Sequence, residues 1–531
     1  MELILYRFQR YFFLLNIIVF VLFSGLLFHT RLFLMGDDAD YLVDGYNFIH
    51  QNTYPSGRSS LYGMALGGVM LFSGLNIVIC KLFSFACAVT GFYLLFKTFK
   101  EKVPYWLLFT ILFFTAINSA VLYYSSSNLS EAFFMMIQGV YFHAIFLLIK
   151  KQETAHEFRR LLPYWCYAGF AGLLVTLSKN VGMLAPLSLA VYYLFKKEYR
   201  HALLGLASFL VFKTPYEILL RLIYGKNTVV GQLGQVMVKD LYYPGKGREN
   251  VTGFLARVYK NADIYLGKEF VEILGLKISH LTFPTWASMI SAAIILLICG
   301  YAIWLAYKQN RFIFFTGIYL VIMTGISFLA LQPDVAQTRI IIIYVPLLFG
   351  LLLYGATHLC KHILQGRGLL IVVVVCCICM VVNFKESVVV AKNNLPVLRE
   401  NISGNKFYGY TPDWLNYLSM GQYIIHTLPD SVGISARKPN SLKVYSGGRN
   451  FVLLSPVENV TADDVLLLLA RIKVRYLVLA SLRLNAEKAT GKIITTLHKY
   501  VDVIREKYPE KVRTIKEIGD TEPCSLVEIL Y

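Results

Sequence analysis

The densest group of acidic side chains in this sequence lies near its N-terminus. Asp37, Asp38 and Asp40 fall within four residues, directly after the first long apolar segment. Carboxylates this close together raise one another's pKa, gather a cation or hold a polar substrate, and a carboxylate can accept the proton of an attacking hydroxyl group. A structural explanation is also open. The apolar residues that follow, Tyr41 among them, recur at helical spacing, and acidic residues stabilise the N-terminus of a helix.

Basic side chains at the ends of two other apolar segments could provide complementary chemistry. Lys179 follows one such segment, and Arg339 precedes another. Arginine suits phosphate because its planar guanidinium donates two parallel hydrogen bonds. Lysine and arginine at such positions are also ordinary anchors at a membrane surface, so each residue has a structural alternative.

Ionisable side chains at two further places in the chain allow both kinds of interpretation. Glu131 stands three residues after Asn128, which is the spacing of a helix capping box. Lys213, Glu217 and Arg221 follow one another at intervals of four and share one helical face. Ionisable groups at membrane depth normally face a bundle interior or an aqueous cavity, although these three could also pair with one another near the surface.

The segments that carry these residues are those of a membrane protein. The chain has 531 residues, of which 56% are hydrophobic and only 16% charged, and its mean hydropathy is +0.56. This composition excludes an ordinary soluble enzyme. A membrane span needs about 20 predominantly apolar residues, and about eleven such runs occur. They cover residues 11–34, 76–96, 104–124, 129–149, 162–178, 181–195, 202–223, 284–306, 312–331, 340–357 and 368–384.

The positions of the basic residues predict the orientation of these spans. One set of alternate connections contains sixteen Lys and Arg residues, and the other contains three. The positive-inside rule therefore predicts a cytoplasmic N-terminus and an extracytoplasmic C-terminus. It also accounts for most of the net charge of +19, so we expect no nucleic-acid partner. Under this topology the acidic cluster, Glu131, Lys179, Arg221 and Arg339 all lie at span ends on the outer side.

The sequence predicts two domains. Residues 1–384 form a transmembrane module with outer loops at 35–61 and 224–283, and residues 385–531 form an extracytoplasmic α/β domain. The Gly and Pro residues at 242–248 are typical of a loop that could close over a substrate. In the outer domain we expect strands at 432–435, 451–454, 474–479 and 525–530, and helices at 463–472 and 486–503. The nine cysteines show no disulfide or zinc spacing.

The chain resembles the membrane-embedded GT-C glycosyltransferases, in particular the group that contains the protein O-mannosyltransferases and the bacterial aminoarabinose transferases of lipid A. Where that group has Asp-Glu-Ala-x-Tyr, this chain has Asp37-Asp-Ala-Asp-Tyr41, so Asp38 replaces a glutamate. Further similarities are the segments Ser130-Glu131, Leu177-Ser-Lys179, Arg339…Tyr344-x-Pro346 and Ser435-Ala-Arg-Lys-Pro439, the last in the outer domain.

The resemblance implies an inverting glycosyltransferase that moves a sugar from a polyprenyl-phosphate donor to a lipid, glycan or protein acceptor on the extracytoplasmic face of a bacterial inner membrane. Asp37 or Asp38 would be the catalytic carboxylate, and the two would hold a divalent metal if one is bound. The residues expected to bind the donor phosphate or the substrate are Lys179, Arg339, Tyr344, Arg58, Glu131, Tyr41 and Arg221.

Two other functions remain open at this point. A lipid-linked glycan polymerase or ligase also has many spans and a large outer loop, and it would depend chiefly on basic residues of that loop, such as Arg248. A transporter or flippase often shows related halves. The sequence has no convincing internal repeat and carries an appended outer domain, which makes a transporter the weaker alternative.

Overall fold

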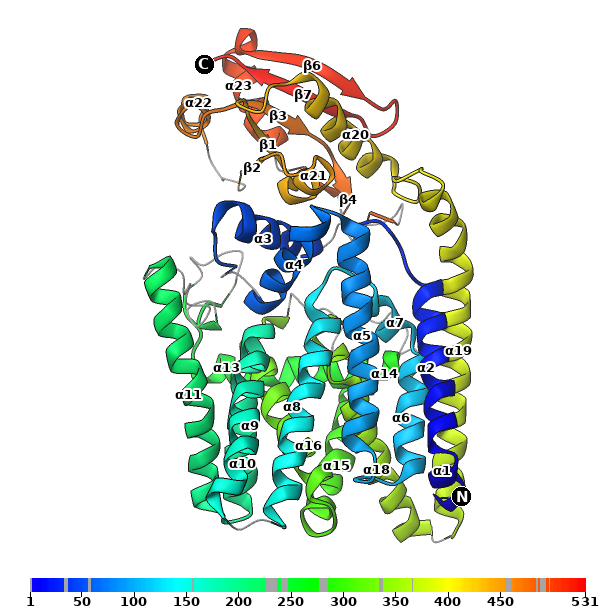
Figure 1. Ribbon diagram of the computed structural model, residues 1–531. Coiled ribbons are helices and arrows are strands. Elements are labelled where there is room, and N and C mark those ends of the chain that lie inside the picture. The colour runs from blue at the N-terminus through cyan, green and yellow to red at the C-terminus, as the bar shows by residue number, and fades with distance from the viewer. Residues whose placement is uncertain are drawn as a thin grey trace.

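The computed structural model describes residues 2–32, 37–55, 59–154, 157–225, 236–239, 247–276, 285–333, 338–364, 366–454, 460–483, 486–487, 493–495 and 497–531. A bundle of long helices forms the larger part of the molecule, and a layer of short helices covers one end of it (Figure 1). The C-terminal domain lies on the far side of that layer from the bundle.

Nine helices among the described residues are long and apolar enough to cross a membrane. The expected multi-span architecture is therefore confirmed. Many apolar side chains of α11 and α19 point away from the protein, as lipid-facing side chains would. The nine helices are α2 (Gln9–Leu26), α5 (Ile77–Phe99), α8 (Ser130–Gln152), α9 (Phe158–Ser178), α11 (Tyr199–Tyr224), α15 (Trp286–Gln309), α16 (Arg311–Ala330), α18 (Val345–Leu364) and α19 (Gly366–Ile402).

Two of the expected spans have a different form. The run at 104–124 divides into α6 (Tyr105–Ile117) and α7 (Ser119–Ser125), which are bent by 68°. Asn118 lies at the break, where its side chain accepts a hydrogen bond from the backbone N–H of Val121 and caps α7. The run at 181–195 begins as a 3-10 helix (Asn180–Leu184) and continues as the short α10 (Ala185–Phe195).

The long connection between α11 and α15 is partly helical. Within it, α13 (Val251–Ala262), a π-helical segment (Asp263–Glu269) and α14 (Phe270–Ile273) follow one another without a break. Residues 240–246, which hold most of the expected mobile loop, lie outside the described residues. The remaining helices of the membrane module are α1 (Glu2–Arg7), α3 (Asp38–Gln51), α4 (Ser60–Ser73) and α17 (Arg339–Ile342).

Helices α3 and α4 form the layer between the bundle and the C-terminal domain (Figure 1). They approach closely through glycines, since a Cβ atom on Gly45 would lie 2.9 Å from the backbone N of Gly67 and 3.0 Å from the backbone O of Gly63. Contacts this short leave no room for a side chain. The position of α3 is therefore fixed against α4 on one side.

This close approach predicts different effects for two glycine substitutions. We expect Gly45→Ala to destabilise the protein by about 1–3 kcal/mol, because a buried methyl group would collide with backbone atoms. Gly68→Ala in α4 is the matched control, since no atom lies within 4 Å of its added Cβ and alanine favours a helix. Thermal unfolding of the two purified variants in detergent checks this. Equal stability of both would contradict the close contact.

The C-terminal domain has the expected α/β architecture. Five strands form one sheet in the order β2-β1-β3-β7-β6, in which β1 pairs in parallel with β2 and β3 while β7 runs antiparallel to β3 and β6. The elements are α20 (Pro412–Thr427), β1 (Gly433–Ala436), α21 (Pro439–Tyr445), β2 (Val452–Leu453), α22 (Ala462–Arg471), β3 (Val474–Leu479), β4 (Leu482–Arg483), β5 (Ile493–Ile494), α23 (His498–Lys507), β6 (Val512–Ile518) and β7 (Cys524–Ile529).

Two boundaries in this region differ from the sequence-based expectation. Helix α19 continues past residue 384 to Ile402, so the first residues assigned to the outer domain extend the last long helix. The prediction of a helix at 486–503 is wrong for the first part of that range. Helix α23 begins only at His498, and Ile493–Ile494 form a strand. The four expected strands are all present.

Candidate active site

Two carboxylates and two cations meet at the end of the bundle that faces the C-terminal domain. Asp37 forms an ion pair with Arg339. The Lys179 Nζ donates a hydrogen bond to Glu131 Oε1 at 2.7 Å. Glu131 also acts electrostatically on Arg339, which links the two pairs. We call these four residues the ionic cluster.

Each member of the ionic cluster stands at the end of a structural element. Asp37 precedes the first residue of α3, and its carbonyl accepts a hydrogen bond from the N–H of Tyr41 at 2.8 Å. Glu131 is the second residue of α8, Lys179 follows the last residue of α9 in an extended conformation, and Arg339 opens α17. Residues distant in the sequence therefore converge because their helices end at the same level of the bundle.

The four side chains differ in burial. Glu131 is 1% exposed, whereas Lys179, Asp37 and Arg339 are 17–24% exposed. Burial alone would lower the pKa of Arg339, but Glu131 and Asp37 outweigh it, so this pKa lies above its usual value. Glu131 Oε2 is buried and has no hydrogen-bond partner among the described residues. The cluster thus combines a fixed positive charge and a buried carboxylate with side chains that a substrate can reach.

Tyr41 lies beside the ionic cluster. Its hydroxyl is 3.1 Å from Ser130 Oγ and 3.4 Å from Ser59 Oγ. Burial and the nearby Glu131 raise the pKa of Tyr41, so its hydroxyl stays protonated and can donate a hydrogen bond.

The capping-box interpretation of Glu131 is wrong. The N-cap residue of α8 is Leu129, and no side chain caps this helix. Asn128 instead donates a hydrogen bond to the backbone carbonyl of Ile77. The partner of Glu131 is Lys179, so the reason for a glutamate at this position lies in the ionic cluster.

Asp37 and Asp38 occupy different environments although they are adjacent. The side chain of Asp38 is fully buried, and its Oδ1 accepts a hydrogen bond from the N–H of Ala39 at 2.8 Å. Asp38 acts electrostatically on Lys81, whose Nζ lies 2.9 Å from His29 Nδ1. Of the two candidate carboxylates, Asp37 is therefore the one that a substrate can reach.

The two carboxylates expected to hold any divalent metal do not form a common donor set. Asp37 is paired with Arg339, while Asp38 is buried near Lys81. A Mg²⁺ or Ca²⁺ ion takes several oxygen ligands at about 2.0–2.6 Å and is disfavoured next to a fixed cation. The described residues contain no group of three or more His, Cys, Asp or Glu side chains that could hold a metal ion. The side chains that the structure describes at this site therefore do not fit a metal.

Two expected site residues, Tyr344 and Arg221, are not brought into the ionic cluster, and the position of a third is not described. Tyr344 is 1% exposed and lies inside the bundle beside Ser327 and Tyr319. Arg221 is exposed on the last turn of the peripheral helix α11. Arg58 lies outside the described residues.

Sequence reasoning missed one acidic residue next to the cluster. Glu269 Oε2 accepts a hydrogen bond from Thr338 Oγ1 at 2.6 Å, and Thr338 directly precedes Arg339. Glu269 lies in the π-helical segment of the long connection, outside any recognisable motif. No feature of the sequence could have identified Glu269 as a site residue.

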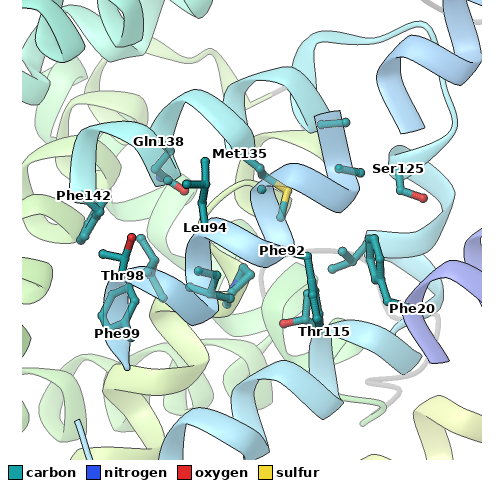
Figure 2. A pocket seen from close by; sticks show the side chains of 18 of the residues that line it. Phe20, Phe92, Leu94, Thr98, Phe99, Thr115, Ser125, Met135, Gln138 and Phe142 are labelled. Atoms are coloured by element: carbon teal, nitrogen blue, oxygen red, sulfur yellow. The ribbon is translucent and has the colours of Figure 1, made fainter. Parts of the chain in front are cut away.

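An apolar cavity lies between helices of the bundle and begins next to the ionic cluster. At its near end are Ala132, which follows Glu131, and Tyr124, on which Glu131 and Arg339 act electrostatically. Figure 2 shows aromatic and aliphatic side chains, among them Phe92 and Leu94, gathered around this space. A second apolar cavity shares four lining residues with the first. The lining residues in common are Leu95, Phe99, Pro346 and Leu347.

Solved structures that are only 11–13% identical to this chain share its fold, which agrees with the GT-C-like fold that the sequence resemblance implied. One solved structure with this fold is ArnT from Cupriavidus metallidurans bound to undecaprenyl phosphate, with 11% identity, a TM-score of 0.57 and coverage of 98% of both chains. Another is the oligosaccharyltransferase AglB from Archaeoglobus fulgidus in complex with an inhibitory peptide and a dolichol-phosphate. It has 13% identity, a TM-score of 0.51 and coverage of 89% of this chain and 69% of AglB. No family model and no curated protein matches the sequence.

Proposed function

We propose that this protein is an inverting glycosyltransferase that takes a sugar from a polyprenyl-phosphate donor. The observation that carries the proposal is the ionic cluster, in which a reachable carboxylate, Asp37, lies beside the cations Arg339 and Lys179 at the end of an apolar cavity. Two proteins of the same fold were solved with undecaprenyl phosphate and with a dolichol-phosphate, which supports a lipid phosphate as the ligand.

The residues of the cluster suit each part of the reaction. Asp37 accepts the proton of the acceptor hydroxyl group, whose oxygen attacks the anomeric carbon of the sugar. The bond between that carbon and the phosphate oxygen breaks, and its electron pair leaves with the polyprenyl phosphate. Arg339 and Lys179 stabilise the charge that develops on this leaving group. Attack from the side opposite the phosphate inverts the configuration at the anomeric carbon.

The ion pairs of the cluster prepare the site for a phosphate. Arg339 has five N–H donors in a planar fork, so it can bind a phosphate while it keeps its contact with Asp37. The buried Glu131 holds the Lys179 ammonium group in place through an ion pair of 2.7 Å. The two cations therefore face the incoming phosphate without a prior rearrangement of the helices.

The distribution of Lys and Arg residues supports an extracytoplasmic site. The sixteen basic residues of one set of connections would lie in the cytoplasm. The ionic cluster and the C-terminal domain, with the lipid, glycan or protein acceptor, would lie on the opposite face. The resemblance to bacterial enzymes supports the inner membrane as the location.

Sugar transfer by the purified protein in detergent tests this function. We expect incubation with polyprenyl-phosphate-linked sugars and candidate lipid, glycan and peptide acceptors to release polyprenyl phosphate and to give a product of inverted anomeric configuration. Transport has no meaning in detergent. Failure to transfer any sugar, combined with movement of a lipid-linked sugar across reconstituted vesicles, would contradict the proposal and favour a flippase.

The apolar cavity supports a further prediction about the donor lipid. Ala88 lines the cavity, so Ala88→Phe would fill part of it. We expect this change to raise the KM for a long-chain polyprenyl donor about tenfold, equivalent to about 1.4 kcal/mol of binding. Donors with a short prenyl chain should be unaffected.

Thr90→Phe is the control for this test, because Thr90 lies on the same helix with an exposed side chain. A steady-state assay with donors of two chain lengths compares the variants. If Ala88→Phe changed the KM of both donors equally, the cavity would not hold the donor lipid.

A further inference from the structure

The short helix α21 of the C-terminal domain contacts the chain at Leu32, before Asp37 and Asp38, which we call the acidic turn. Its last residue, Tyr445, accepts a hydrogen bond at its hydroxyl from the backbone N–H of Leu32 at 3.1 Å. The hydroxyl of Tyr410 donates to the carbonyl of Leu32 at 2.9 Å and lies 2.9 Å from the Tyr445 hydroxyl. Both backbone groups of Leu32, a residue that is 1% exposed, are thus held by the C-terminal domain.

The same helix also contacts the chain just after the acidic turn. Asn440 Nδ2 donates a hydrogen bond to Asp40 Oδ1 at 2.6 Å. Lys443 Nζ donates to Asn47 Oδ1 at 2.9 Å, and the side chain of this lysine is only 5% exposed. Asp40 and Asn47 are seven residues apart and therefore lie on one face of α3. This face is the one that α21 covers.

The backbone that follows α21 packs directly on α3. Gly448 has φ +106°, and a Cβ atom there would lie 2.5 Å from the hydroxyl of Tyr46. A residue with a side chain is excluded both by the backbone conformation and by the contact. Since Gly45 is fixed against α4, α3 is held between α4 and the C-terminal domain, an arrangement visible in Figure 1.

We infer that α21 positions the acidic turn, with Asn440, Lys443 and Tyr445 as positioning residues for Asp37. Asp37 lies between the two contacts of α21, at Leu32 and at Asp40, and it directly precedes α3. The C-terminal domain is then a structural part of the active site. This inference rests on the proposed function of Asp37.

The expected effects are large because catalysis depends on the exact placement of the base. A displacement of about 1 Å by a change outside the reacting groups can cost about 100-fold in rate. A loosened α3 would displace Asp37, whereas Lys179 and Arg339 belong to other elements and keep their positions. The inference therefore predicts a lower kcat with little change in the KM for the donor.

A reciprocal exchange of two side chains tests the contact at Asp40. Asn440→Asp would place a second carboxylate against Asp40, and we expect kcat to fall about 10- to 100-fold with a donor KM within about threefold of the wild type. The double variant Asp40→Asn/Asn440→Asp restores an amide next to a carboxylate. Its kcat should return to within about threefold of that of Asp40→Asn, whose amide oxygen can still accept from Asn440.

A matched pair of tyrosine substitutions tests the contact at Leu32. Tyr445→Phe removes the hydroxyl that accepts from Leu32 and should lower kcat about tenfold. Tyr508→Phe makes the same chemical change at a hydroxyl that donates to Asp463 Oδ1, away from α3. We expect the control to change kcat by less than about twofold.

Hydrogen exchange of the backbone amides of α3 separates this inference from the proposed function. Exchange should be faster in Asn440→Asp and Tyr445→Phe, unchanged in Tyr508→Phe and slow again in the double variant. We expect this exchange result even if no sugar transfer were found. In that case the proposed function would be contradicted, while the contact between α21 and α3 would still be supported. Wild-type kcat and wild-type exchange in both variants, in a protein that Asp37→Asn inactivates, would overturn the inference.

Discussion

Asp37→Asn is expected to lower kcat about a thousandfold, because general-base catalysis by a positioned carboxylate is worth about 10²–10⁴ in rate. Asparagine has almost the same shape, and its side-chain oxygen can still accept a hydrogen bond from Arg339. The ionic cluster should therefore remain assembled while the base is lost. Steady-state kinetics with a polyprenyl-phosphate-linked sugar measures the effect, and the KM for the donor should change by less than about threefold.

Two control variants accompany this substitution. Asp463→Asn changes an exposed carboxylate at the outer side of the C-terminal domain and should have no effect on kcat. Asp38→Asn changes a fully buried carboxylate near Lys81, so it should lower the thermal stability of the protein. The kcat of the folded Asp38→Asn protein should fall less than that of Asp37→Asn. More than a tenth of wild-type kcat in Asp37→Asn, or a greater loss in folded Asp38→Asn, would assign the base to another residue.

The pair of Lys179 and Glu131 should separate phosphate binding from stability. Lys179→Met removes the only cation that the buried Glu131 carboxylate is hydrogen-bonded to among the described residues, and breaking such a buried pair costs about 3–5 kcal/mol. In Lys179→Met/Glu131→Gln the buried charge is gone, so stability should return. The affinity for polyprenyl phosphate should stay about 10- to 100-fold weaker in both variants, because one charge-assisted hydrogen bond to the phosphate is lost.

Thermal unfolding and the binding of undecaprenyl phosphate in detergent measure the two effects separately. The matched control is Lys213→Met/Glu217→Gln, which removes a comparable ion pair from the peripheral helix α11. This control should leave the affinity unchanged. If Lys179→Met/Glu131→Gln recovered both stability and affinity, Lys179 would have a structural role only.

The parts of the candidate site that could be predicted from the sequence are the charged residues that stand next to apolar runs. Asp37, Lys179 and Arg339 follow or precede apolar runs, so their location at helix ends on one side of the bundle could be read from the sequence. Their pairing could not. The contact between Glu131 and Lys179 depends on how α8 packs against α9, and the spacing of Asn128 and Glu131 offered a sufficient local explanation instead.

The distinction between Asp37 and Asp38 also needed the structure. Adjacent residues at the start of a helix point in different directions, and Asp38 acts electrostatically on Lys81 and on Tyr410, which are distant from it in the sequence. Tyr344 illustrates the same difficulty, since it lies close to Arg339 in the sequence but inside the bundle.

For the fold, hydropathy predicted where the long helices occur but not where they break. The apolar run at 104–124 is continuous, and the bend of 68° at Asn118 depends on a polar side chain that caps the next helix. In the C-terminal domain the expected strands are apolar. Strand β6 was missed because most of its side chains are at least partly exposed and several are charged, which is common at the edge of a sheet.

The most direct test of the central claim is the structure of the protein with bound undecaprenyl phosphate, determined from the purified protein in a lipid nanodisc. We expect density for the phosphate in contact with Lys179 Nζ and the Arg339 guanidinium, next to Asp37, with the prenyl chain entering the apolar cavity lined by Ala132 and Phe92. A phosphate bound elsewhere on the protein, with the ionic cluster unchanged and unoccupied, would contradict the central claim.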